Sequence, residues 1–167
     1  MRDVALIEKK INTIDQAKAQ ISAWKLAGKT FSFTNGCFDI LHPGHFYFFR
    51  KAKEANPSSK ILVLLLDDAN IKRRKGPERP VNKLAKRITH LQEIIEIDYI
   101  LPWQDSWEEI STYVSQLKPA YYAAVKGDPG LENKLKKIKE FGGKVILLEK
   151  LPGFSTTNIL QNVKLNK

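Results

Sequence analysis

The chain has 167 residues, of which 43% are hydrophobic and 28% are charged; this size and balance are typical of one globular domain with a sizeable core. Its longest apolar run, residues 61–66, is too short to span a membrane, and its single cysteine excludes an intrachain disulfide and a thiolate-rich metal site. The net charge of +10 favours polyanionic partners, whether nucleic acid, anionic lipid or phosphorylated small molecules.

The pattern predicts a single domain over residues 1–167, in which residues 1–28 form a helical extension packed on the rest. The N-terminus carries Asp3 and Glu8 instead of a basic region followed by an apolar one, so we expect a cytoplasmic protein with no membrane partner. Apolar residues at helical spacing predict a helix over 13–27, which Gly28 ends.

A short strand is predicted at 30–34 and a helix at 43–55, where Pro43 suits the first turn. Residues 61–66 are apolar throughout, as in a parallel strand covered on both faces. The basic run Lys72-Arg73-Arg74-Lys75 has the charge pattern of a solvated loop. Asn82 is a candidate cap for a helix to residue 96, a strand follows at 97–101, and Asp105 or Ser106 is a candidate cap for a helix to 117.

The remaining pieces are a strand at 121–125, a lysine-rich helix at 132–141, a strand at 145–148 and a final helix at 155–163. Five strands with intervening helices predict an α/β fold: a Rossmann-like, doubly wound, mostly parallel sheet with helices on both faces. In such sheets ligands bind beyond the carboxyl ends of the strands.

The first strand leads into residues 34–45, with the sequence TNGCFDILHPGH. Gly36 permits close approach of the backbone to a ligand, and the helix that begins near Pro43 offers unpaired N–H groups to an anion. These features predict a phosphate-binding loop. Neither the Gly-Lys-Ser/Thr nucleotide-binding loop nor a Gly-x-Gly-x-x-Gly string occurs here.

His42 and His45 are three residues apart, so their side chains share one face of the helix start. Both can donate hydrogen bonds to phosphate oxygens and stabilise charge during phosphoryl transfer. Zinc binding is an alternative, but the third histidine, His90, lies far along the chain. A pair of surface histidines is the remaining interpretation.

The string His42-Pro43-Gly44-His45, after a strand and at the start of a helix, matches the His-x-Gly-His signature of the cytidylyltransferase-like nucleotidyltransferases. The wider 34–45 string closely resembles the adenylyltransferases of D-glycero-β-D-manno-heptose 1-phosphate, stand-alone or as one half of a bifunctional enzyme. The resemblance covers about residues 10–160. It implies the nucleotidyltransferase fold, with His42, His45 and Lys75 as catalytic residues and a homodimer as the assembly.

Three more segments are similar to this family. They are the basic run Lys72-Arg73-Arg74-Lys75 with Arg79 and Arg87 after it, the end of the fourth strand at Gly127 and Asp128, and Ser155-Thr156-Thr157. Taken singly, the first has the pattern of a solvated loop, the second that of a turn and the third that of an N-cap. Together they follow the carboxyl ends of successive strands, which favours a ligand site.

The resemblance therefore assigns two groups of binding residues. The acceptor-binding group is Asp39, Lys72, Lys75 and Arg79. The nucleotide-binding group is Thr34, Asn35, Gly36, Cys37, Phe38, His42, His45, Arg87, Gly127, Asp128, Ser155, Thr156 and Thr157. From its surroundings alone, the Cys37 side chain is a buried small hydrophobe and not a nucleophile.

The implied reaction transfers AMP from ATP to a sugar 1-phosphate similar to heptose 1-phosphate and releases pyrophosphate, with Mg²⁺ accompanying the triphosphate and its protein ligands unassigned. The acceptor phosphate is largely ionised near neutrality, so no general base is needed. Leu66-Asp67 and the single Gly127 depart from the family pattern, which keeps open a cytidylyltransferase that uses CTP and glycerol 3-phosphate or another polyol phosphate. A non-catalytic nucleic-acid-binding module is the alternative of another class, although no motif of that kind is present.

Overall fold

The computed structural model describes residues 13–104, 114, 116–128, 131–140, 142–154, 156 and 159. Its centre is one sheet of five strands, all parallel, in the order β3-β2-β1-β4-β5. The strands are β1 (Phe31–Gly36), β2 (Lys60–Leu66), β3 (Tyr99–Trp103), β4 (Tyr121–Val125) and β5 (Lys144–Leu148). The predicted fold class is thus confirmed, with a sheet that is wholly parallel.

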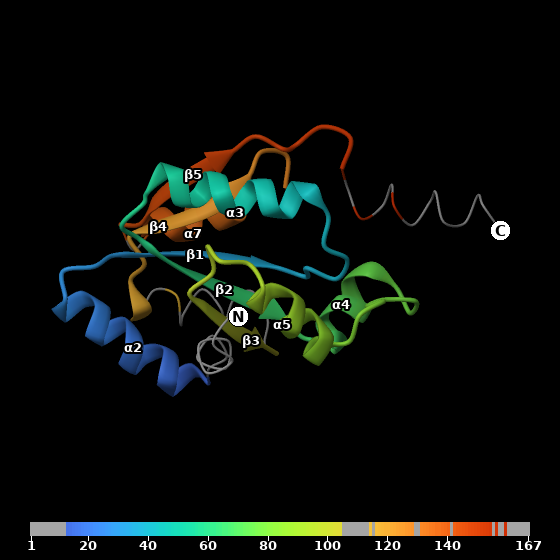
Figure 1. Cartoon of the computed structure of the whole chain (residues 1–167), viewed down its shortest axis with the longest axis horizontal. Helices are drawn as coiled ribbons and strands as arrows, with labels where there is room; N and C mark the ends of the chain where they lie inside the picture. The colour runs from blue at the N-terminus through green and yellow to red at the C-terminus, as the bar shows by residue number, and fades with distance from the viewer. Residues whose placement is uncertain are drawn as a thin grey trace.

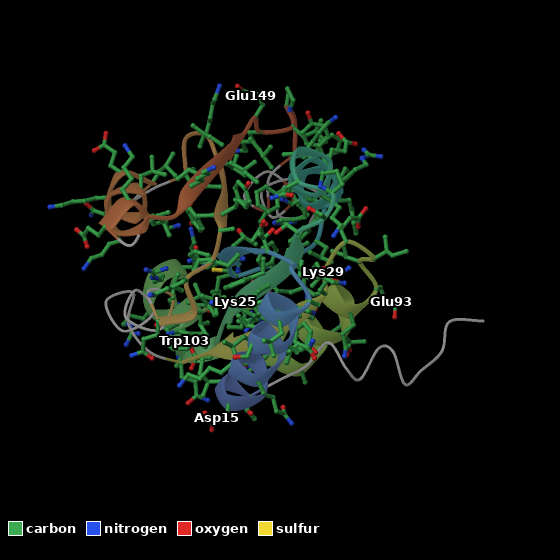
Figure 2. All side chains as sticks on the ribbon, turned by 90° about the vertical axis from the view of Figure 1, so that its left-hand side faces the viewer. Asp15, Lys25, Lys29, Glu93, Trp103 and Glu149 are labelled. Carbon is green, nitrogen blue, oxygen red and sulfur yellow. The ribbon has the colours of Figure 1, made fainter. Side chains whose placement is uncertain are left out.

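Helices cover both faces of this sheet (Figure 1). They are α2 (Ile14–Leu26), α3 (Pro43–Ala55), α4 (Asp68–Lys75), α5 (Leu84–Gln92) and α7 (Leu131–Glu140). Glu149, just after β5, and Asp15, on α2, lie at opposite ends of the molecule in Figure 2.

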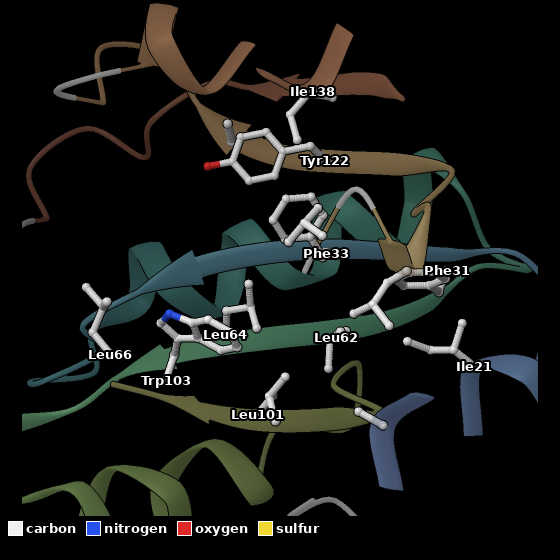
Figure 3. Packing of buried hydrophobic residues seen from close by; sticks show 14 of the residues in the cluster. Ile21, Phe31, Phe33, Leu62, Leu64, Leu66, Leu101, Trp103, Tyr122 and Ile138 are labelled. Carbon is white, nitrogen blue, oxygen red and sulfur yellow. The ribbon is translucent and has the colours of Figure 1, made fainter. Parts of the chain in front are cut away.

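The strand β2 shows why the sheet needs two covered faces. From Ile61 to Leu66 its side chains are buried and alternate in direction, as the two-residue period of a strand requires. Leu62, Leu64 and Leu66 pack with α2 and α7, whereas Ile61, Val63 and Leu65 pack with α3 and α5. Figure 3 shows the first of these two clusters.

Several predicted boundaries need correction. Residues 68–75 form a helix and not a loop, since Asp67 caps it by accepting the N–H of Asn70 at 2.8 Å. The helix α5 begins after Lys83, because the Asn82 side chain bonds elsewhere. The strand β3 runs to Trp103 and includes Pro102, which an edge strand tolerates.

Other expectations fall partly or wholly outside the described residues. The predicted helices at 105–117 and 155–163 are described at only a few positions, and of the expected 1–28 extension the structure describes α2 and the residues around it. Ala17, Ile21 and Trp24 of α2 are buried against the sheet. Within the described part of the chain, no helix is long and apolar enough to cross a membrane.

A fully buried arginine joins the segments that meet at the carboxyl ends of β1 and β2. The Arg87 side chain, on α5, is 0% exposed. Its guanidinium donates to the carbonyl oxygens of Asn82 (3.0 Å), Cys37 (2.8 Å) and Leu66 (2.7 Å) and to the Asp68 carboxylate (2.9 Å). A buried charge is tolerated when it is paired and hydrogen-bonded in this way.

We expect the substitution Arg87→Met to lower the free energy of unfolding by about 3 kcal/mol or more, because it leaves three buried carbonyls and a carboxylate without their donor. Urea unfolding followed by circular dichroism measures this. The matched control is Lys86→Met on the exposed face of the same helix, with an expected change within about 0.5 kcal/mol. Equal effects of the two substitutions would show that the Arg87 contacts contribute nothing specific.

Candidate active site

A cleft of about 270 Å³ lies at the carboxyl ends of β1 and β4. From β1 the chain crosses through α3 to β2 on one side, while β4 lies on the other side of β1. This reversal of strand order is the point at which doubly wound sheets bind ligands. The predicted site residues that line the cleft are Thr34, Asn35, Gly36, Cys37, Phe38, His42, His45, Asp128 and Thr156.

Two stacked imidazoles form one wall of the cleft at the start of α3. The ring centroids of His42 and His45 are 3.9 Å apart, and their planes are inclined by 32°. The backbone N–H of His42 donates to Nδ1 of His45 at 3.3 Å, which leaves the proton of the neutral His45 ring on Nε2. His45 can therefore offer an Nε2–H donor.

Both imidazoles are held in the neutral form near pH 7. Burial, with a smaller contribution from His42, lowers the pKa of His45 to about 4. Burial and the nearby charge of Lys150 also lower the pKa of His42. Neutral rings can stack at this distance, whereas two imidazolium ions would repel each other.

Gly44 is required by the position of the His42 ring. A Cβ atom at residue 44 would lie 2.9 Å from both Cε1 and Nδ1 of His42, closer than such atoms can approach. Nδ1 of His42 is buried and has no hydrogen-bond partner among the described residues. Since this atom is buried, Nε2 is the ring nitrogen of His42 that remains to face the cleft.

Phe38 turns the chain from β1 toward α3. Its φ of 44° lies in the left-handed region, which costs a non-glycine residue about 1 kcal/mol or more. Its ring packs 5.3 Å from that of His45 and 5.4 Å from that of Phe49. A Cβ at residue 36 would lie 2.8 Å from this ring, so Gly36 lets Phe38 fold back and support His45.

Asp39 does not line the cleft. Its carboxylate accepts from Arg79 Nε (2.6 Å), Val81 N (2.9 Å) and Asn82 N (2.7 Å), and the residue is 2% exposed. Burial acts to raise the pKa of Asp39, but the two backbone N–H groups and Arg79 outweigh it and lower that pKa. Asp39 and Arg79 thus hold segment 79–82 against the β1–α3 loop.

The predicted cationic residues lie on the β2 side of the cleft and do not line it. Lys72 and Lys75 are exposed on α4. Burial raises the pKa of the Cys37 thiol, and the positive charges of Lys75, Arg87, Arg74 and Arg79 oppose this rise. These charges therefore lie near the end of β1, although Arg87 is inside the protein and not on a ligand-facing surface.

The β4 and β5 ends supply the other wall. Lys134 bonds to the Asp128 carboxylate at 2.6 Å, and Gly127, with a φ of 77°, forms the preceding turn without lining the cleft. Lys126 pairs with Glu149. Ser155 and Thr157 lie outside the described residues.

Sequence reasoning missed several residues that line the cleft: Gly44, Phe48, Tyr122, Ala123, Ala124, Val125, Glu149, Lys150, Leu151 and Phe154. The rule that ligands bind beyond the carboxyl ends of strands could have found the residues after β5. For Tyr122, an aromatic residue within a buried strand, the sequence gives no signal apart from core packing.

Among the described residues, no group of three or more His, Cys, Asp or Glu side chains could hold a metal ion. The zinc alternative for His42 and His45 therefore finds no third ligand in this part of the chain.

Comparisons with known proteins agree on one family. The model of a family described as cytidylyltransferase-like matches residues 33–162. The bifunctional protein HldE of Paramagnetospirillum magneticum is 36% identical over 168 residues, which are 98% of this chain and 33% of that protein. The protein of the same name from Shewanella baltica is 34% identical over 155 residues, 92% of this chain and 32% of that protein. The chain spans about a third of the length of these curated relatives.

Two solved structures share the fold. A lipopolysaccharide core biosynthesis protein from Thermoplasma volcanium has a TM-score of 0.57 and 20% identity, covering 73% of this chain and 96% of its own. A pantoate-beta-alanine ligase from Francisella tularensis has a TM-score of 0.62 and 15% identity, covering 93% of this chain and 77% of its own. At these identities the likeness concerns the fold alone.

The contact between Gly44 and His42 leads to a spectroscopic prediction. We expect Gly44→Ala to displace the His42 ring and separate the two imidazoles, since the added Cβ would lie 2.9 Å from that ring. In ¹H–¹³C NMR spectra the resonances of His42 and His45 should shift, while that of His90 on α5 should stay in place as an internal control. Unchanged resonances of both cleft histidines would contradict the packing described here.

The low pKa of His45 leads to a prediction about stability. Between pH 6.5, where an unfolded chain takes up the proton, and about 4, where the folded protein does, the unfolded state binds more protons. The free energy of unfolding should therefore decrease as the pH is lowered through this window.

His45→Gln should remove part of that decrease, leaving the part due to His42. Urea unfolding of both proteins at intervals from pH 7.5 to 4.5 measures the effect, and His90→Gln is the control. Parallel pH dependences of the wild type and His45→Gln would show that His45 is not held neutral by the fold.

Proposed function

The chain belongs to the cytidylyltransferase-like family of nucleotidyltransferases, and we propose that it transfers AMP from ATP to a sugar 1-phosphate, forming a nucleotide-sugar and pyrophosphate. The observation that carries the proposal is the pair of neutral imidazoles at the start of α3, facing a cleft at the switch point of the sheet.

The His42 and His45 donors suit the charge that develops in this reaction. An oxygen of the acceptor phosphate attacks the α-phosphorus, a new P–O bond forms, and the bond from the α-phosphorus to the bridging oxygen breaks as pyrophosphate leaves. Imidazole N–H groups and the backbone N–H of Gly44, in the first turn of α3, would stabilise the negative charge on the phosphate oxygens. Positioning and charge neutralisation supply most of the catalysis in phosphoryl transfer.

The acceptor provides its own nucleophile. A phosphate monoester has a second pKa of about 6 and is largely ionised near neutrality. No proton has to be removed from it during the attack. The neutral state of His45 is consistent with this mechanism, because the ring is required as a hydrogen-bond donor and not as a base.

The cleft and its rim divide the substrates between two sides. The triphosphate would lie beside His42, His45, Lys150 and Thr156, which line the cleft. The acceptor phosphate would approach from the α4 side, where Lys72 and Lys75 are exposed. Lys75 is near enough to the end of β1 for its positive charge to oppose the rise in the pKa of Cys37. We assign Arg79 and Arg87 to holding the loops of this side in place.

Mg²⁺ is expected to arrive with the nucleotide. Mg²⁺ commonly keeps several waters and binds through one or two carboxylates plus substrate phosphates. The Asp39 and Asp128 carboxylates already bind Arg79 and Lys134, respectively. The triphosphate itself would therefore provide most of the ligands, and the metal would neutralise the charge of the leaving pyrophosphate.

ATP and a heptose 1-phosphate are the substrates that the sequence resemblance favours, and the two relatives named HldE support this choice. CTP with glycerol 3-phosphate or another polyol phosphate is the alternative pair.

Pyrophosphate release tests the proposal. Purified protein with Mg²⁺ should release pyrophosphate from ATP in the presence of heptose 1-phosphate, and more slowly from CTP or with glycerol 3-phosphate. His42→Ala and His45→Ala should each lower kcat by about 10²- to 10³-fold, as loss of one transition-state donor does. His90→Ala, outside the cleft, is the matched control and should keep the wild-type rate.

Circular dichroism should show the same fold in all three variants. Full turnover by either cleft variant, or no pyrophosphate release by the wild type with any pair in a panel of nucleotides and sugar or polyol phosphates, would refute the proposal.

A further inference from the structure

We propose that Tyr122 is a positioning residue for nucleoside recognition: its hydroxyl fixes the side-chain amide of Asn35 so that the amide hydrogens face the cleft and bind an acceptor atom of the nucleoside. This inference rests on the proposed function and deepens it, because it names the residues of the site that bind the nucleoside.

The two residues meet across neighbouring strands. Phe33 on β1 is the register partner of Tyr122 on β4, and Asn35 is two residues beyond Phe33 on the same face of β1. The Tyr122 ring packs on that of Phe33, with 4.7 Å between centroids. Its hydroxyl points toward the carboxyl end of the sheet (Figure 3), where it donates to Oδ1 of Asn35 at 2.8 Å.

This bond determines which end of the amide faces the cleft. Tyr122 is 1% exposed, and its hydroxyl hydrogen has no acceptor other than Oδ1 in the hydrogen bonds of the described residues. Turning the amide over would leave that buried hydrogen unpaired, at a cost of about 1–3 kcal/mol. Oδ1 therefore stays on Tyr122, and Nδ2 is directed away from it.

The Nδ2 group of Asn35 is left for a ligand. Asn35 lines the cleft and is partly exposed, and its Nδ2 donates to no residue in the described part of the chain. An amide donor binds a ring nitrogen, a carbonyl or a hydroxyl oxygen.

The position of Asn35 points to the nucleoside and not to a phosphate. The cationic residues of α4 lie on the β2 side of β1, whereas Tyr122 lies on the β4 side. Ala124, Val125 and Leu151 line the cleft there. Asp128, Glu149 and Lys150 also line this side of the cleft. Next to the apolar surface of Ala124, Val125 and Leu151, the one fixed neutral donor suits a base or ribose better than it suits a charged group.

Calorimetric titration with the α,β-methylene analogue of ATP, from which AMP cannot be transferred, tests this assignment. Tyr122→Phe keeps the ring that packs on Phe33 and removes only the hydroxyl. We expect it to bind the analogue about three- to tenfold more weakly, the effect of losing the orientation of one hydrogen bond. The matched control is Tyr121→Phe on the same strand, which should bind as the wild type does.

Two further measurements separate positioning from a general structural effect. The double variant with Asn35→Ala should bind no more weakly than Asn35→Ala alone, because Tyr122 acts through Asn35. Inorganic tripolyphosphate, which has no nucleoside, should bind the wild type and Tyr122→Phe equally.

Three results would overturn the inference: unchanged affinity of Tyr122→Phe for the analogue, multiplied effects in the double variant, or an equal loss of affinity for tripolyphosphate. Its failure is distinct from that of the proposed function. A wild type that binds the analogue but releases no pyrophosphate refutes the proposed reaction alone, and a wild type that does not bind the analogue refutes both.

Discussion

The buried guanidinium of Arg87 is the contact on which the arrangement of the site depends. A charge that is removed from water must be surrounded by acceptors, and here those acceptors come from the β1–α3 loop, the end of β2, the start of α4 and the segment before α5. One side chain therefore joins three stretches of the chain: Cys37, residues 66–68 and Asn82. Asp39 adds a second connection between the β1–α3 loop and residues 81 and 82.

This rigid support explains how the two histidines can be close and neutral. The loop that Arg87 and Asp39 hold leads through Phe38, with its left-handed backbone, to the start of α3. The strain at Phe38 is tolerated because its ring packs between Gly36 and the rings of His45 and Phe49. Burial then lowers the pKa of both imidazoles, so donors are in place without the repulsion that two cations would create.

The sequence predicts the order of the strands along the chain, because apolar periodicity is a local pattern. It also predicts most of the residues around His42 and His45 that line the cleft, because they follow directly on the carboxyl end of a predicted strand. It does not predict which charged residues are paired with each other. Asp39 and Arg87 have the pattern of ligand-binding residues, since a sequence shows their charge but not the buried partners that occupy them. The sequence does not indicate a role for Tyr122 either, because its hydrogen bond to Asn35 joins residues that are 87 positions apart.

The division of the cleft also determines where substrate choice is made. All nucleoside triphosphates carry the same phosphates, so His42, His45 and Lys150 can provide rate and affinity but cannot distinguish ATP from CTP. Discrimination requires a group that meets the base, and a site built to hydrogen-bond one partner rejects an analogue that leaves its donor unpaired. On the β4 side the donor in this position is the Asn35 amide, held by Tyr122. The imidazole pair therefore stands at the start of α3, and the proposed nucleoside donor stands at the end of β1, held from β4, so selectivity can change at Asn35 and Tyr122 without altering the imidazole pair.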